Sequence, residues 1–171
     1  MGLSKFGKAL FGQDVEVGDL AGTGIVYGST RNINKGTDLA FEYTAAGKPD
    51  PTLAVHVPVG QANHYVEFDW YTTNAEGKLI LIDAQNIGKG ASAYDFREGS
   101  TFSSTSWGRD AQEEIMADAL KQSEAAKRVG AMVEWRVPSG TPDEVVEALE
   151  KAISNKDIEN IVVVKVKPNT P

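Results

Sequence analysis

The sequence has no cysteine among its 171 residues, which excludes disulfides, thiolate metal sites and cysteine nucleophiles. It has only two histidines, so a zinc site built from several histidines is not expected. No apolar run approaches the roughly 20 residues of a membrane-spanning helix, and no cleavable signal peptide is visible. These absences favour a protein that folds without disulfides, in a reducing compartment, and that does not insert stably into a membrane.

Positive charge is also scarce. Lysine and arginine together number 17 against 24 acidic residues, which gives a net charge of -7. An acidic surface counts against unspecific binding of nucleic acid, which relies on basic side chains. It does not exclude a metal-dependent nuclease, because the metal ion itself brings local positive charge.

The hydrophobic residues, 41% of the chain, suffice for a core, and the length suggests one domain. Residues 1–30 are interpreted as an N-terminal arm or linker and residues 31–171 as the folded domain. Its periodicity predicts helices near 37–46, 108–128 and 141–153, and strands at TLAVHVPVG, HYVEFDWYT, KLILIDA, AMVEWRV and IENIVVVKVKP. This order predicts a single α/β domain with a mixed central sheet flanked by helices.

Two predicted helices carry specific local signals. The apolar stripe of the long helix is expected to consist of Ala111, Ile115, Ala119 and Leu120. In the following helix, Thr141 is expected to be the N-cap and Glu144 to complete a capping box.

A tight turn between the strands HYVEFDWYT and KLILIDA fixes which residues face each other. A three-residue loop that ends at Gly77 would place this glycine in the left-handed conformation that such hairpins favour. Counting outward from the loop puts Asp69 opposite Asp83 and Glu67 opposite Gln85.

Directly opposite residues have Cβ atoms roughly 4.5–5.5 Å apart, so Asp69 and Asp83 would repel each other. Such a pair either takes up a proton or holds a cation, and Mg²⁺ prefers one or two carboxylates together with waters and phosphate oxygens. The alternative is that the two residues only mark the end of the strands, and a register slip of one residue would separate them.

Four stretches in this order, VEFDW, KLILIDAQN, KQSEAAKRVG and MVEWRV, resemble the restriction-endonuclease-fold toxin domains of bacterial polymorphic toxin systems. These domains belong to the PD-(D/E)xK nuclease superfamily, and the resemblance covers roughly residues 40 to 168. It implies a restriction-endonuclease-like fold in which Asp69 and Asp83 bind the metal. It also implies that Glu42 joins the metal site from the preceding helix and that Gln122 contributes to catalysis.

Gln85 departs from the family pattern, which has a lysine at this position. A glutamine amide can hydrogen-bond a water or a phosphate oxygen, but it supplies no full positive charge. Three explanations stay open: a natural active variant, a degenerate inactive copy, or a substitution that silences a toxic protein. Lys89, in the glycine-rich loop just beyond, is expected to contact a backbone phosphate.

The function implied by the resemblance is that of a nuclease, a DNase that uses Mg²⁺ or Mn²⁺ to hydrolyse phosphodiester bonds. As the toxin domain of an antibacterial effector, it would be delivered into the target-cell cytoplasm and would be blocked by a cognate immunity protein. The alternative is a protein without catalysis: a silent nuclease-fold binding protein or an acidic immunity-type partner.

Two weaker motifs also contain candidate site residues. The segment Glu134–Arg136 imitates the acid-x-basic signature and is kept as a back-up site. The hydroxyl-rich segment 99–108 lacks the G-x-S-x-G pattern of a serine nucleophile, so it is interpreted as a loop over the site.

Overall fold

The computed structural model describes residue 20 and residues 23–30, 36–60, 64–87 and 91–167, with only the backbone described for 36–39. Its elements are β1 (Val26–Ser29), α2 (Gly36–Ala46), β2 (Leu53–Pro58), β3 (Tyr65–Phe68), β4 (Trp70–Thr73), β5 (Leu79–Ala84), α3 (Ser106–Arg128), β6 (Met132–Pro138), α4 (Asp143–Ser154) and β7 (Ile161–Val166). The predicted α/β class is confirmed, and the predicted helices and strands lie close to their expected positions.

The strands form two sheets, whereas the sequence suggested one central sheet. One sheet has the order β1-β2-β3 and is antiparallel, and the other has the order β4-β5-β6-β7. In the second sheet β4 runs antiparallel to β5, while β5, β6 and β7 are parallel to one another. The chain passes from the first sheet to the second at Asp69, a single bent residue between β3 and β4.

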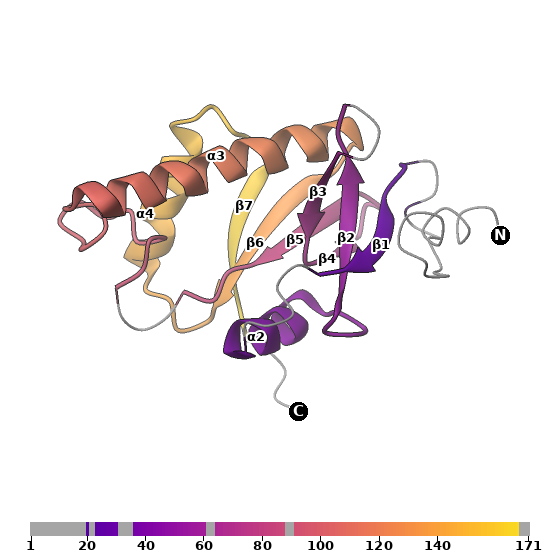
Figure 1. Ribbon diagram of the computed structural model, residues 1–171, viewed down its shortest axis with the longest axis horizontal. Helices are drawn as coiled ribbons and strands as arrows, with labels where there is room; N and C mark the ends of the chain where they lie inside the picture. Colours follow the sequence, from indigo (N-terminus) through magenta and orange to yellow (C-terminus); the bar gives the residue numbers. More distant parts are fainter. Residues whose placement is uncertain (1–19, 21–22, 31–35, 61–63, 88–90, 168–171) are drawn as a thin grey trace.

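The four-stranded sheet is covered on both faces. Figure 1 shows α3 and α4 on one face and α2 on the other. The side chains of β5 alternate accordingly: Leu81 joins the main core, while Ile80 and Ile82 pack with Phe41 and Ala45 of α2. A strand covered on both faces is expected to be apolar throughout, which explains the continuous run KLILI.

The buried face of α3 is more polar than the predicted stripe. Its buried residues are Gly108, Gln112, Met116, Ala119, Gln122, Ser123, Ala125 and Ala126. Leu120, which the sequence placed in the stripe, is exposed. The prediction is confirmed for Ala119 and for Ile115, which packs against the core, and is wrong for Leu120. Periodicity of apolar residues cannot show that two glutamines and a serine have polar partners inside the fold.

The predicted capping box of α4 does not form. The helix begins after Pro142 without a side-chain cap, and the Thr141 hydroxyl is buried with no hydrogen bond in the described part of the chain. Two acidic residues in the first turn, Asp143 and Glu144, instead complement the helix dipole. The predicted inner face is correct, since Val145 is buried together with Leu149 and Ile153.

The folded unit begins earlier than the predicted boundary at residue 31. Strand β1 pairs with β2 along its length, from Val26 opposite His56 to Ser29 opposite Leu53. Leu20 also belongs to the main core. The predicted arm is therefore shorter than residues 1–30; residues 1–19 lie outside the described part of the chain.

Candidate active site

The hairpin has the predicted register. Trp70 pairs with Ile82, Thr73 pairs with Leu79, and Gly77 has a positive φ of 79°. Asp69 lies at the bend directly beyond this ladder, and its N–H donates to the Ile82 carbonyl at 2.9 Å. The turn predicted from the sequence thus brings Asp69 next to the strand that carries Asp83.

Asp69 is fixed at the bend between the sheets. Its side chain is buried, and its Oδ2 accepts a hydrogen bond of 2.7 Å from the backbone N–H of Ala84. Because this donor belongs to β5, the carboxylate is held against the strand that carries Asp83. The carboxyls of Asp69 and Asp83 lie within hydrogen-bonding reach of each other.

Asp83 is partly exposed and is held by two amides. Gln122 Nε2 on α3 donates to Asp83 Oδ2 at 2.6 Å, and Gln85 Nε2 donates to the same oxygen at 2.7 Å. The indole Nε1 of Trp135 donates to Gln122 Oε1 at 2.6 Å. Since an indole N–H can only donate, this bond orients the Gln122 amide so that its nitrogen faces Asp83.

Glu67 does not lie opposite Gln85, contrary to the sequence-based expectation. The break at Asp69 assigns Glu67 to the other sheet, where it pairs with His56 on β2. His56 Nε2 and Glu67 Oε1 are 3.1 Å apart. Counting outward from the turn fails at this point because the ladder ends where the chain changes sheets.

A lysine that the sequence analysis missed lies beside the aspartates. Lys48 Nζ is 3.8 Å from Glu42 Oε2 and 3.9 Å from Asp69 Oδ1, and the Lys48 side chain has no exposed surface. Glu42, on α2, is buried as well. In the sequence, Lys48 stands in the segment GKPDP, and no motif spacing connects it to Asp69.

Burial governs the electrostatics of the pair. It raises the pKa of Asp69 well above its ordinary value, and the negative charges of Asp83 and Glu42 raise it further, against the opposing effect of Lys48. The pKa of Asp83 is also raised by burial, although the hydrogen bonds from Gln122, Asp69 and Gln85 act in the other direction. Without a cation, the two carboxyls therefore tend to retain a proton.

Tyr94 is a second residue near this cluster that the sequence analysis did not single out. Its ring meets Trp135 edge-on, with centroids 6.0 Å apart. Burial raises the pKa of the Tyr94 hydroxyl, and the charges of Asp83, Asp118 and Asp69 raise it further. The group stays protonated at neutral pH and is available as a neutral hydrogen-bond donor.

The donor set fits a hard cation such as Mg²⁺ as a two-carboxylate site. No group of three or more His, Cys, Asp or Glu side chains placed to hold a metal occurs among the described residues. Magnesium needs only one or two protein carboxylates when waters and substrate oxygens complete its shell. Asp69 and Asp83 are the residues that would hold it, with Glu42 contributing negative charge nearby.

Of the remaining sequence candidates, Lys89 lies outside the described residues, and the Glu134–Arg136 motif does not join this cluster. In the back-up motif, Arg136 Nε donates to Glu134 Oε1 at 2.7 Å, so the acid is paired with the motif's own base. Arg136 Nη1 also donates to the Ala45 carbonyl on α2, which ties it to the fold.

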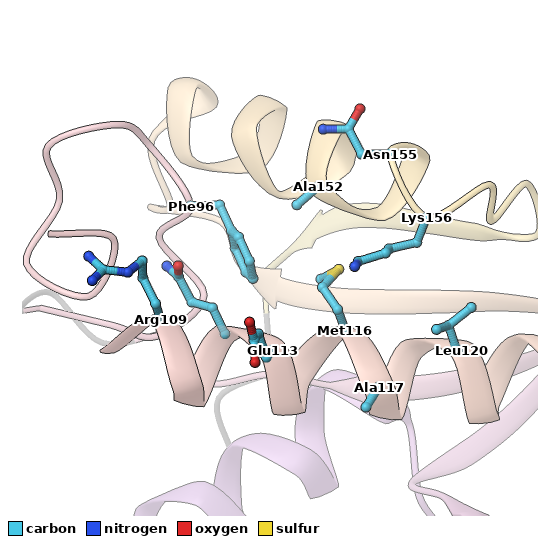
Figure 2. A pocket seen from close by; sticks show the side chains of 10 residues that line it. Phe96, Arg109, Glu113, Met116, Ala117, Leu120, Ala152, Asn155 and Lys156 are labelled. Atoms are coloured by element: carbon cyan, nitrogen blue, oxygen red, sulfur yellow. The ribbon is translucent and has the colours of Figure 1, made fainter. Parts of the chain in front are cut away.

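Two surface hollows lie away from the acidic pair. One, of about 550 Å³, runs between α3 and α4, and Figure 2 shows Phe96, Met116 and Lys156 within it. The other, of about 640 Å³, is lined by residues of the β2–β3 connection, β3 and α3, among them His64, Leu120 and Arg128. Asp69, Asp83, Gln85 and Gln122 line neither hollow.

No family model matches the sequence, and neither a curated protein nor a solved structure matches it. None of the described helices is long and apolar enough to cross a membrane.

Proposed function

We propose that the protein is a metal-dependent nuclease that hydrolyses phosphodiester bonds with Mg²⁺, or Mn²⁺, held by Asp69 and Asp83. The observation that carries the proposal is that these two carboxyls, both with raised pKa, lie within hydrogen-bonding reach of each other just beyond the end of a tight hairpin. A hairpin that served only stability would not bring two acids this close together.

The residues around the pair have separate roles in this proposal. Asp69, fixed by the Ala84 N–H, and Asp83, fixed by Gln122, present their remaining oxygens to the ion. A bound Mg²⁺ would polarise the phosphate and lower the pKa of a coordinated water. Gln122 and Gln85 keep the Asp83 carboxylate in one orientation, and Gln85 has a second amide hydrogen for a water or phosphate oxygen.

The proposed biological context follows from the resemblance to toxin nucleases. The substrate would be DNA, and the chain would be the toxin domain of an antibacterial effector that acts in the target-cell cytoplasm. A cognate immunity protein would protect the producing cell. The net charge of -7 counts against binding of nucleic acid through a basic surface, so this proposal requires the metal ion to supply the local positive charge that attracts phosphate.

A second candidate function is a catalytically silent binding protein with the same architecture, such as an acidic immunity-type partner. The observation in its favour is Gln85, which donates to Asp83 and offers no positive charge at the position of the family lysine.

The test is cleavage of supercoiled plasmid and of single-stranded RNA in Mg²⁺ or Mn²⁺, with EDTA as the blank. The parent is expected to cut DNA, and Asp69→Asn and Asp83→Asn are expected to lose the activity. Asp110→Asn, an exposed acid on α3, is the matched control and should cut like the parent. A parent that cuts neither nucleic acid with either metal would overturn the enzyme proposal in favour of the silent protein.

A further inference from the structure

We propose that Lys48 supplies the positive charge of this site in place of a lysine at position 85, and that its buried ammonium group favours binding of the substrate phosphate through its charge, without direct contact. This inference rests on the proposed nuclease function and goes beyond it by assigning the cationic residue. It also selects among the three explanations for Gln85: the protein is a natural active variant whose cation comes from a different element.

The first observation is the state of the Lys48 ammonium group. Its Nζ is buried and makes no hydrogen bond within the described part of the chain. The oxygens of Glu42 and Asp69 are 3.8 and 3.9 Å away, well beyond the length of a direct charge-assisted hydrogen bond. A lysine that served only to neutralise the two acids would be expected to bind one of them closely. Lys48 is aimed at the acidic cluster while its hydrogen-bonding capacity remains unused.

The second observation is how the backbone places this side chain. Helix α2 ends at Ala46, and Gly47 follows with a positive φ of 73°. The Lys48 N–H then closes the turn by donating to the Tyr43 carbonyl at 3.1 Å. A left-handed glycine directly after a helix is a defined C-terminal cap, so the reversal that directs Lys48 toward the sheet is built into the fold.

The third observation is the location of the two nitrogen groups around the acid pair. Gln85 Nε2 lies on Asp83, at the side facing α3. Lys48 Nζ lies beside Asp69 and Glu42, at the side facing α2. Because the two carboxyls lie within hydrogen-bonding reach of each other, the two nitrogens flank the acid pair from opposite faces of the sheet.

The charges balance only when Lys48 is included. Glu42, Asp69 and Asp83 bring three negative charges when ionised, and a divalent ion brings two positive charges. With Lys48 included, the charges of the loaded site sum to zero, so the site does not repel the single negative charge of a phosphodiester. Without Lys48 the loaded site would carry one net negative charge and would repel the phosphate.

A charge-relocation experiment tests the inference. Four proteins are compared: the parent, Lys48→Met, Gln85→Lys, and the double variant Lys48→Met/Gln85→Lys. Lys127→Met is the matched control, because Lys127 on α3 is about half exposed and pairs with Glu124 on the same helix. Each protein is assayed for plasmid cleavage in Mg²⁺, for binding of a labelled DNA duplex in Ca²⁺ by fluorescence anisotropy, and for folding by thermal unfolding.

Lys48→Met is expected to lower the cleavage rate by roughly a hundredfold, the usual effect of removing one group that stabilises charge in a transition state. It should also weaken DNA binding in Ca²⁺, which a purely structural lysine would not do. The double variant should regain cleavage, because the charge returns from the opposite side of the acid pair. Lys127→Met should behave like the parent in all assays.

The single variant Gln85→Lys keeps the test decisive even if Lys48→Met does not fold. Because Lys48 already provides the charge, Gln85→Lys is expected to change the rate by less than roughly threefold. A parent that is inactive while Gln85→Lys cuts DNA would overturn the role of Lys48 but support the nuclease site. A folded Lys48→Met that cuts and binds like the parent would overturn the inference alone. If no variant cuts, the proposed function and the inference both fail.

Discussion

Two buried polar clusters begin at neighbouring residues of α3 and differ in what they do for the protein. Gln122 reaches Asp83, while the next residue, Ser123, donates to Asn160 Oδ1 at 2.5 Å. Asn160 Nδ2 returns a hydrogen bond of 3.0 Å to the Ser123 carbonyl. The Ser123–Asn160 pair is neutral, and each group finds a partner, as is typical of polar groups that stabilise a core.

The cluster at Asp69 has the opposite character. It combines carboxyls whose pKa values are raised with a buried ammonium group that makes no hydrogen bond in the described part of the chain. Burying charges in this way costs several kcal/mol unless they are well paired. The comparison indicates that the Ser123–Asn160 pair stabilises the core, whereas the charged cluster lowers stability, as the proposed metal site would in the absence of its ion.

The largest expected effect comes from neutralising the acidic pair. Asp83→Asn should reduce cleavage by at least roughly a hundredfold, because one ligand of the metal loses its charge. The same change should raise the melting temperature of the metal-free protein, since the repulsion with Asp69 disappears. Calorimetry in EDTA and cleavage in Mg²⁺ provide the two measurements. A large loss of thermal stability would show instead that Asp83 is needed as a structural partner of Gln122.

Disrupting the Ser123–Asn160 pair should lower stability and leave the cleavage rate unchanged. Asn160→Ala leaves the Ser123 hydroxyl and carbonyl without their side-chain partner and is expected to lower the free energy of unfolding by about 2 kcal/mol. Urea titration measures this loss. The cleavage rate per folded molecule should match the parent, and a loss of activity comparable with that of Asp83→Asn would remove the distinction between the two clusters.

The two clusters should also respond differently to pH. In the folded protein the pKa of Asp69 lies well above the ordinary value of 3.8, so the folded state binds a proton that the unfolded state releases. Stability from this group is therefore present at acid pH and is lost as the pH rises from about 3.8 through the folded-state pKa. The free energy of unfolding of the parent and of Asp69→Asn is measured against pH by urea titration without metal. The difference between the two profiles gives the slope that Asp69 contributes.

Magnesium should reduce the same slope, because the ion offsets the charge that the proton leaves behind. Asn160→Ala, whose cluster has no titrating group, should keep the parent's pH dependence. If the free energy of unfolding depends on pH in the same way in the parent and in Asp69→Asn, the fold does not raise the pKa of Asp69.

The smallest expected effect concerns a buried polar group that belongs to neither cluster. The Thr141 hydroxyl is buried without a hydrogen bond in the described part of the chain. Thr141→Val keeps the shape, removes an unsatisfied group and should raise the free energy of unfolding by about 1 kcal/mol. Ser123→Ala, which removes a satisfied hydroxyl, should do the opposite. A loss of stability in Thr141→Val would mean that this hydroxyl has a partner.

Local signals predicted the α/β class and most element positions well. They did not predict that the chain changes sheets at Asp69 or that Gln122 points into the fold. The run HYVEFDWYT alternates as one continuous strand would, yet its two halves pair with β2 and β5 in different sheets. Alternation reports which side chains face inward, but it carries no information about which strand provides the hydrogen bonds.

The sequence by itself determined the register of the hairpin, one strand of which begins next to Asp69 while the other carries Asp83. A three-residue loop ending in a left-handed glycine fixes the register of its own strands, and this requires only contacts between residues close together in the chain. The tertiary structure alone decided that Lys48 lies beside them and that Trp135 orients Gln122, since these contacts require α2 and α3 to pack on opposite faces of the sheet. Side chains far apart in the chain become neighbours only through the burial of apolar surface, and that burial leaves no local pattern at the polar residues it brings together.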